Sequence, residues 1–371
     1  MTARPADLAC QALRQPRSMA GMDLAGWDAL LPQAARADVT ARLAALLQAQ
    51  GLLDRLPEAP RRQLQAALQV VKAQQVGVQH EVAQIASALS GLGAPVLLLK
   101  GAAYVAAGLP AAMGRLLSDV DILVPRSALA RAESQLMLAG WMGKAVDAYD
   151  ARYYREWMHE IPPMLHARRA TTLDVHHNIL PLTLRRPPDA ALLLADAVPV
   201  PGHAGLHMLA PADMVLHSMA HLFHNDDLGH ALRDLSDLDL LLRHFNALPG
   251  FWPRLTERAD ALHLQQVLAY GLWATQHLLG TPMPAAAHPA PGPAVASGWQ
   301  AALMQALWRR ALRTPHADAA LPGQAIARFV LYLRAHALRM PPLMLARHLG
   351  IKAWKRWAPP AASTAPAVRP G

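Results

Sequence analysis

Along the first ninety residues, hydrophobic positions recur at spacings of three, four and seven, as they do on one face of a helix. Leu64, Leu68 and Val71 form one such set. No residues with an evident chemical role accompany this periodicity. We therefore expect residues 1–90 to form a helical region that packs against the rest of the protein.

The pattern changes at residue 91, where a Gly- and Pro-containing turn precedes the uninterrupted apolar run Val96–Leu99. A short run of this kind is typical of a strand that is buried on both faces. Three later segments have strand character: residues 119–124, 163–167 and 171–176. Ser127 is a candidate N-cap for an intervening helix that ends near Ala139.

These elements predict a small mixed sheet with helices on one face, in a core of residues 91–205. Helical spacing returns from about Leu206 and defines a C-terminal helical domain, residues 206–357, with a Pro/Ala-rich linker at 281–298. The Pro/Ala-rich segment 358–371 is expected to be disordered. The predicted fold class is therefore α+β, a mixed-sheet core flanked by helical regions on both sides.

The composition narrows the functional classes only slightly. The 371 residues carry a formal charge of +9 with a pI near 10.2, which suits a polyanionic partner, although an Ala/Arg/Pro-rich chain can equally reflect a GC-rich genome. The single cysteine, Cys10, excludes an intramolecular disulfide. Because the sequence has neither a secretory apolar segment nor an apolar run of about 18 residues, we expect a cytoplasmic protein without a membrane span.

Two aspartates, Asp119 and Asp121, open the second predicted strand. Side chains at positions i and i+2 of a strand point to the same face, roughly 6–7 Å apart. Like charges this close repel and raise each other's pKa. A hard divalent cation with oxygen ligands would relieve that repulsion, so the pair predicts a metal site.

Further polar residues flank this pair. Asp174 and His176 share a face of the strand at 171–176, by the same alternation. Lys100 and Gly101 end the first strand, where a glycine lets backbone approach a phosphate and the following helix N-terminus favours an anion. Arg115, four residues before the first aspartate, can add a positive charge for the same phosphates, or can be an ordinary surface arginine.

The run LLLKGAAYVAAGLPAAMGRLLSDVDILV, followed by TLDVHHNI, resembles the nucleotidyltransferases of the DNA polymerase beta superfamily. It is most similar to a poorly characterised bacterial branch with a Leu-Lys-Gly strand end, an Arg-x-x-Ser-Asp-x-Asp block and a later Asp-x-His strand. The resemblance covers roughly residues 90–180. It implies a nucleotidyltransferase core at 91–205.

The resemblance also implies a mechanism. Two Mg²⁺ ions, or Mn²⁺ in their place, would support transfer of a nucleoside monophosphate from an NTP to an acceptor hydroxyl, with release of pyrophosphate. The catalytic and metal-binding residues it implies are Asp119, Asp121 and Asp174, with Asp174 as candidate general base. The nucleotide-binding residues it implies are Lys100, Gly101, Arg115, Ser118 and His176.

The acceptor stays open: a small molecule, a sugar, a protein side chain or RNA. The alternative from another class is a non-catalytic nucleotide- or nucleic-acid-binding protein that retains the fold. Three converging carboxylates favour the enzyme, because a binding protein has no evident need for them.

A histidine cluster, His217, His221 and His224, follows the core. Histidines four residues apart share a helix face and can bind a transition metal, as in a metal hydrolase, but they are also consistent with packing or with a substrate contact. The adjacent Arg233 and Asp234 are expected to form a structural ion pair.

Basic and aromatic residues alternate near the C-terminus. This pattern predicts contact with an anionic lipid or nucleic acid, or else a solvated helix face. The basic residues are Arg328, Arg334, Arg339, Arg347, Lys352, Lys355 and Arg356.

Overall fold

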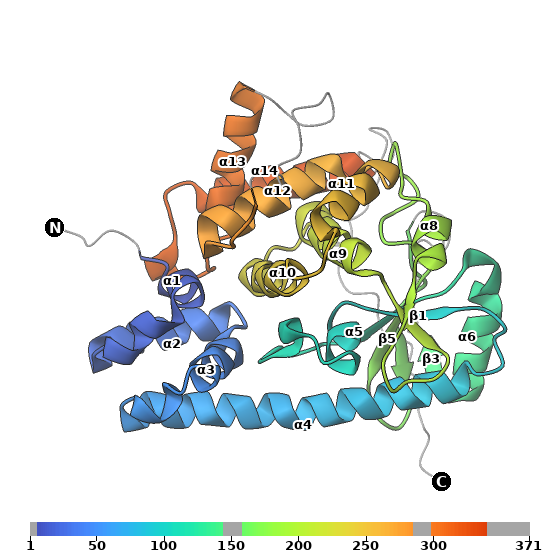
Figure 1. Cartoon of the computed structure of the whole chain (residues 1–371), viewed down its shortest axis with the longest axis horizontal. Coiled ribbons are helices and arrows are strands. Elements are labelled where there is room, and N and C mark those ends of the chain that lie inside the picture. Colours follow the sequence, from blue (N-terminus) through green and yellow to red (C-terminus); the bar gives the residue numbers. More distant parts are fainter. Residues whose placement is uncertain (1–5, 144–157, 285–297, 340–371) are drawn as a thin grey trace, which may run out of the picture.

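The computed structural model describes residues 6–143, 158–284 and 298–339. The described part of the N-terminal region is helical, as predicted, with α1 (Leu8–Arg14), α2 (Leu24–Arg36), α3 (Thr40–Ala49) and α4 (Glu58–Ala88). The long helix α4 runs along one side of the molecule, beneath α3 and the sheet (Figure 1). Its buried face explains the spacing of Leu64 and Val71.

The core is a mixed sheet, which confirms the predicted α+β class. Its strands are β1 (Val96–Leu99), β2 (Val120–Leu123), β3 (Trp141–Gly143), β4 (Met164–His166), β5 (Thr172–His176), β6 (Val198–Pro199) and β7 (Leu206–Met208). Their order across the sheet is β3-β4-β5-β2-β1-β7-β6. β2 is antiparallel to β1 and parallel to β5, so the strands that carry the predicted site are central neighbours.

The central strands form where the sequence is most apolar. Every residue of β1 and β2 is buried, including Asp121 within the second. β1 leads directly into α5 (Lys100–Ala106), so Lys100 stands at the junction of strand and helix. This junction, β2 and the neighbouring β5 bring polar side chains into an otherwise apolar layer.

Three local predictions are wrong in detail. Asp119 precedes β2, which begins at Val120. Helix α6 (Leu129–Leu138) starts after a 3₁₀ turn and has Ala128, not Ser127, at its N-cap. Residues 206–208 form a strand instead of a helix, because β7 pairs in parallel with β1 and thereby satisfies backbone groups that would otherwise be buried without partners.

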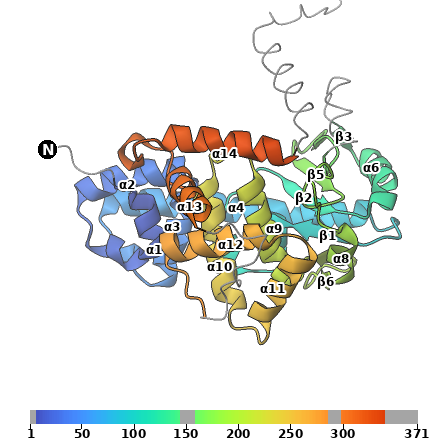
Figure 2. The ribbon, with the colours of Figure 1, turned by 90° about the horizontal axis from the view of Figure 1, so that it is seen from above.

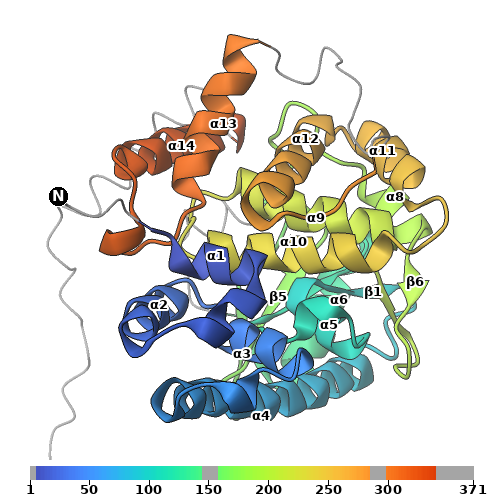
Figure 3. The ribbon, with the colours of Figure 1, turned by 60° about the vertical axis from the view of Figure 1, so that its left-hand side comes forward.

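Helical structure then begins at Pro211. From there the helices are α9 (Pro211–His224), α10 (Ala231–Phe245), α11 (Phe251–Ala261), α12 (Gln265–Ala274), α13 (Trp299–Ala311) and α14 (Gln324–Arg339). The short helix α8 (Ala190–Ala195) comes earlier, before β6. α9 contacts α5, α10, α11 and α12, and lies among them (Figure 3). It is therefore buried along almost its whole length and brings polar side chains to the β1–α5 junction.

Helix α14 packs on α13 and α9 and runs along one edge of the molecule (Figure 2). Among the described residues, no helix has the length and apolarity that crossing a membrane requires. The predicted linker lies largely outside the described residues, and the predicted tail at 358–371 lies entirely outside them.

Candidate active site

Asp121 and Asp174 are direct neighbours in the parallel pairing of β2 with β5. Asp119 immediately precedes β2. Burial, followed by the charge of Asp121, raises the pKa of Asp119. Burial and the charges of Asp121, Glu160 and Asp119 raise the pKa of Asp174 to about 7. The structure thus places the three predicted aspartates on or beside adjacent strands, where burial disfavours the charged forms of Asp119 and Asp174.

Asp121 differs from the other two because cations surround it. Its Oδ1 atom lies 2.9 Å from Lys100 Nζ and 3.0 Å from His176 Nε2. Burial alone would raise the pKa of Asp121, but Lys100 and His176 outweigh burial and hold it well below its ordinary value. Asp121 is therefore an ionised carboxylate at neutral pH.

Lys100 reaches this position from an unusual backbone conformation. Its φ of 43° is left-handed, which costs a residue with a β-carbon of the order of 1–3 kcal/mol. The antiparallel register sets Leu99 opposite Asp121, so the next residue leaves the strand beside that carboxylate. Such strain, at a residue whose ammonium group contacts a predicted metal ligand, is typical of a functional position.

The carboxylates fit a hard divalent cation. Asp174 Oδ1 is buried and accepts no hydrogen bond, and an orphaned carboxylate oxygen of this kind is costly unless a cation binds it. Among the described residues, the three aspartates do not form a group whose ligand atoms all lie within 4.8 Å of one another, and one oxygen of Asp121 accepts a hydrogen bond from Lys100. The donor set suits Mg²⁺ or Mn²⁺, both of which prefer oxygen ligands.

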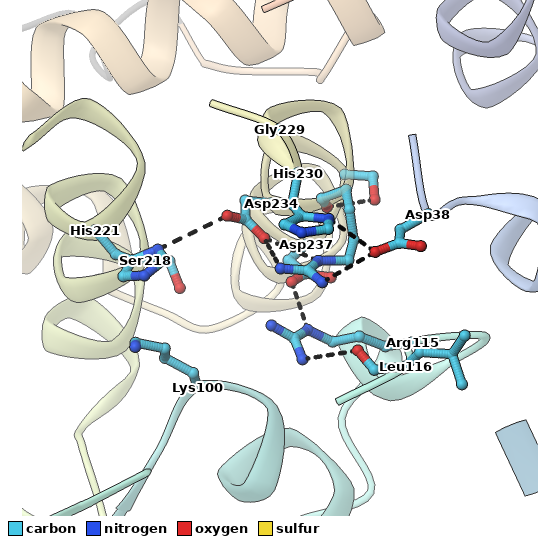
Figure 4. A network of polar contacts seen from close by, with 12 residues as sticks. Asp38, Lys100, Arg115, Leu116, Ser218, His221, Gly229, His230, Asp234 and Asp237 are labelled. Carbon is cyan, nitrogen blue, oxygen red and sulfur yellow. Dashed lines mark hydrogen bonds and ion pairs between the residues drawn. The ribbon is translucent and has the colours of Figure 1, made fainter. Parts of the chain in front are cut away.

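Arg115 is buried, not exposed in a loop. Its Nε donates to Asp237 Oδ2 at 2.7 Å, which fastens the segment before Asp119 to α10 (Figure 4). A β-carbon on Gly101 would lie 2.4 Å from Arg115 Nη1 and 2.9 Å from Leu117. The space that the sequence suggested for a phosphate beside Gly101 is therefore filled by these two side chains.

Ser118 and His176 both act on the aspartates. The Ser118 hydroxyl bonds to Asp119 and opposes the rise in its pKa. His176 is buried between two carboxylates, with Nε2 on Asp121 and Nδ1 3.3 Å from Glu160. It is placed to orient Asp121.

The predicted histidine cluster is divided. His217 and His221 both lie on α9. Burial and then the charge of Lys100 hold the pKa of His217 well below its ordinary value, whereas the charge of Lys100 and then burial do so for His221. Figure 4 shows the Lys100 side chain reaching toward the helix that carries Ser218 and His221. The pKa of His224 falls to about 3 because of burial and of Arg334 and Arg339.

Among the described residues, the one group of three potential ligands whose atoms all lie within 4.8 Å of one another is His159, Glu160 and His176. The metal-hydrolase alternative at residues 217–224 therefore finds no support in the geometry. Sequence reasoning missed His159 and Glu160, which belong to no predicted strand. Glu160 forms an isolated β-bridge to His176. The sequence feature that could have identified them is the adjacent His-Glu pair itself, which lies shortly before the strand predicted at 163–167.

The predicted Arg233–Asp234 ion pair is confirmed, with Nη2 and Oδ1 3.0 Å apart. It extends further than expected. Asp38, in the N-terminal helical region, lies 3.6 Å from Arg233 Nη1 and 2.7 Å from His230 Nδ1 (Figure 4). The network therefore joins α10 to the segment between α2 and α3.

The described basic residues near the C-terminus turn inward. Arg334 donates to Phe223 O and to Gln266, and Arg328 donates to main-chain oxygens of the α13 region. Arg339 pairs with Asp226. These three arginines therefore bind neighbouring helices, and the four other basic residues of the pattern lie outside the described part of the chain.

Comparison with known proteins agrees with this geometry. A search of curated proteins found no match. The model of a family described as uncharacterised nucleotidyltransferase matches residues 23–280, which include α2–α4, the whole sheet and helices α9–α12. The match spans well over half of the 371 residues and all three aspartates, and the chain belongs to this nucleotidyltransferase family.

Proposed function

We propose that this protein transfers a nucleoside monophosphate from an NTP to an acceptor hydroxyl, with Mg²⁺ as cofactor and pyrophosphate as the second product. The observation that carries the proposal is the pairing of Asp121 with Asp174 on adjacent strands, with Asp119 one residue before the first. Family membership supports the reaction class. The ordered carboxylates supply the chemistry that such a transfer needs.

Asp119, Asp121 and Asp174 would hold the metal ions. When bound, divalent ions at such a site neutralise phosphate charge and favour ionisation of the attacking hydroxyl. The chain's own contribution is to place and orient the reacting groups, because phosphoryl-type transfer needs little covalent help from the protein.

Asp174 is the proposed proton acceptor. Its Oδ1 is buried and has no hydrogen-bond partner in the protein, so no protein donor competes with an acceptor hydroxyl for this oxygen. As the acceptor oxygen forms its bond to the α-phosphorus, the bond to the pyrophosphate oxygen breaks, and the hydroxyl proton passes to the Asp174 carboxylate. No covalent enzyme intermediate is required.

Lys100 is the proposed phosphate contact. Its ammonium group is bound to Asp121, and cations on the aspartates would release it toward the negative triphosphate. His221 lies nearby with its side chain 34% exposed, so it is accessible to a bound nucleotide. Arg115 acts indirectly in this scheme, by holding the segment that leads to Asp119.

Nucleotide binding and transfer can be tested separately. Calorimetry with each NTP, with and without Mg²⁺, should show binding that depends on the metal and is lost in Asp119→Asn/Asp121→Asn. If the native protein binds nucleotide but transfers no label from the α-phosphorus to any acceptor pool, the activity is contradicted and the protein is a nucleotide-binding member of the family.

A further inference from the structure

We propose that His159, Glu160 and His176 form a second metal site, specific for a divalent transition metal and distinct from the aspartates. Their potential ligand atoms all lie within 4.8 Å of one another. The site does not depend on the proposed nucleotidyl transfer, because it rests on these three side chains alone.

The two nitrogens of His176 indicate that its ring needs a cation on one side. Nε2 lies 3.0 Å from Asp121 Oδ1, an oxygen that already accepts a hydrogen bond from Lys100 Nζ, so Nε2 is placed as a second donor to it. Nδ1 then presents a lone pair, yet it is buried and faces Glu160 Oε2 at 3.3 Å without a hydrogen bond. Two lone pairs at this distance repel unless a proton or a metal ion lies between them.

His159 favours the metal ion over a proton. Its Nδ1 is also buried and makes no hydrogen bond, and its ring centroid lies 5.3 Å from that of His176. A single proton between His176 and Glu160 would leave this second nitrogen without a partner. One metal ion bound by all three side chains would satisfy both imidazole nitrogens and the carboxylate together.

The backbone holds these groups in place. His177 N donates to His159 O at 2.8 Å, and Glu160 forms an isolated antiparallel β-bridge to His176, the last residue of β5. Two of the three residues are therefore tied to the strand that carries the third. Such pre-ordering favours metal binding, because less conformational entropy is lost when the ligands close on the ion.

The donor set defines the class of metal. Two imidazole nitrogens and one carboxylate suit Zn²⁺, Fe²⁺, Mn²⁺ or Co²⁺, whereas Mg²⁺ prefers oxygen alone. A metal-bound histidine commonly donates its other N–H to a carboxylate, which is the relation of His176 to Asp121. The metal would thus fix the ring that orients Asp121, which makes His176 a positioning residue for the neighbouring site.

Cobalt is the most direct probe, since its visible absorption reports nitrogen ligands and its displacement by Zn²⁺ reports competition. After removal of metals with a chelator, the full-length protein should bind one Co²⁺ with this spectrum, and Asp119→Asn should leave it unchanged. Loss of a residue that merely hydrogen-bonds to a metal ligand typically weakens metal affinity by about 10- to 100-fold. His159→Ala removes a proposed ligand itself and should weaken Co²⁺ affinity by at least as much, and Glu160→Gln should also weaken it.

His207→Ala is the matched control, because His207 on β7 has another buried Nδ1 without a hydrogen bond and lies outside the group. Circular dichroism and thermal unfolding of each variant would exclude loss of fold. The proposal is overturned if the native protein binds no stoichiometric Co²⁺. It is also overturned if His159→Ala binds as well as native, or if His207→Ala loses the spectrum equally.

Discussion

Asp237 Oδ2 lies 2.7 Å from Arg115 Nε, and this buried ion pair fixes the approach to the candidate site. The other oxygen of Asp237 lies 2.7 Å from Arg42 Nη2 on α3. One carboxylate on α10 therefore joins the N-terminal helices to the segment that leads into Asp119. Burial lowers the pKa of Arg42, and Asp237 opposes that effect.

Replacement of Asp237 by alanine should be strongly destabilising. The change leaves two buried guanidinium groups without their counter-ion, and breaking a buried pair from one side typically costs 3–5 kcal/mol. Chemical denaturation should show a loss of about that size in the free energy of unfolding. Asp260→Ala, at an exposed position of α11, should change it by less than about 0.5 kcal/mol. Equal losses in the two variants would refute the structural role.

Gly101→Ala should destabilise the protein through the same segment. A β-carbon there meets Arg115 and Leu117 at distances below 3 Å, and overpacking of this kind typically costs 1–3 kcal/mol. Gly77→Ala is the matched control: it lies inside α4 with no atom within 4 Å of the added carbon. It should stabilise by up to about 1 kcal/mol. Thermal unfolding that ranks the two variants in the opposite order would contradict this account.

The strands that carry the candidate site were easier to predict from the sequence than the contacts around them. Asp121 and Asp174 lie on strands, as predicted, because strand alternation is a local property and because apolar residues surround both aspartates in β2 and β5. The role of Arg115 was not predictable, since its partner Asp237 lies 122 residues away in the chain. Likewise, β7 escaped notice because its three residues acquire strand structure by pairing with β1 on one side and β6 on the other.

Lys100→Met should separate metal binding from nucleotide binding. The substitution removes a positive charge 2.9 Å from Asp121, so Mg²⁺ affinity in the absence of nucleotide should rise. NTP affinity should fall by about tenfold or more, which corresponds to about 1.4 kcal/mol. Calorimetry on both ligands measures this, with the exposed Lys72→Met as control. A parallel fall in both affinities would instead indicate a damaged site.

Asp226→Asn should lower stability in a pH-dependent manner. Burial would raise the pKa of Asp226, but Arg339, 2.9 Å away, outweighs burial and lowers it. The stabilisation is therefore present above the unfolded-state pKa and is lost as pH falls through the lower folded-state pKa. Because the carboxylate is 32% exposed, we expect about 1 kcal/mol or less at pH 7.

Chemical denaturation at pH 7 and at acidic pH would measure this difference. The free energies of unfolding of native protein and Asp226→Asn should converge as the pH falls. A gap that widens on acidification would mean that Arg339 does not stabilise the ionised carboxylate.

The central claim is that Asp119, Asp121 and Asp174 catalyse nucleotidyl transfer. The most direct measurement incubates native protein and Asp174→Asn with each NTP labelled at the α-phosphorus, Mg²⁺ and a cell extract as acceptor pool. Native protein should transfer label to an acceptor and release pyrophosphate, whereas Asp174→Asn should bind Mg²⁺ and NTP but lose transfer by at least about 100-fold. Equal transfer by both proteins, or none by the native protein, would contradict the account.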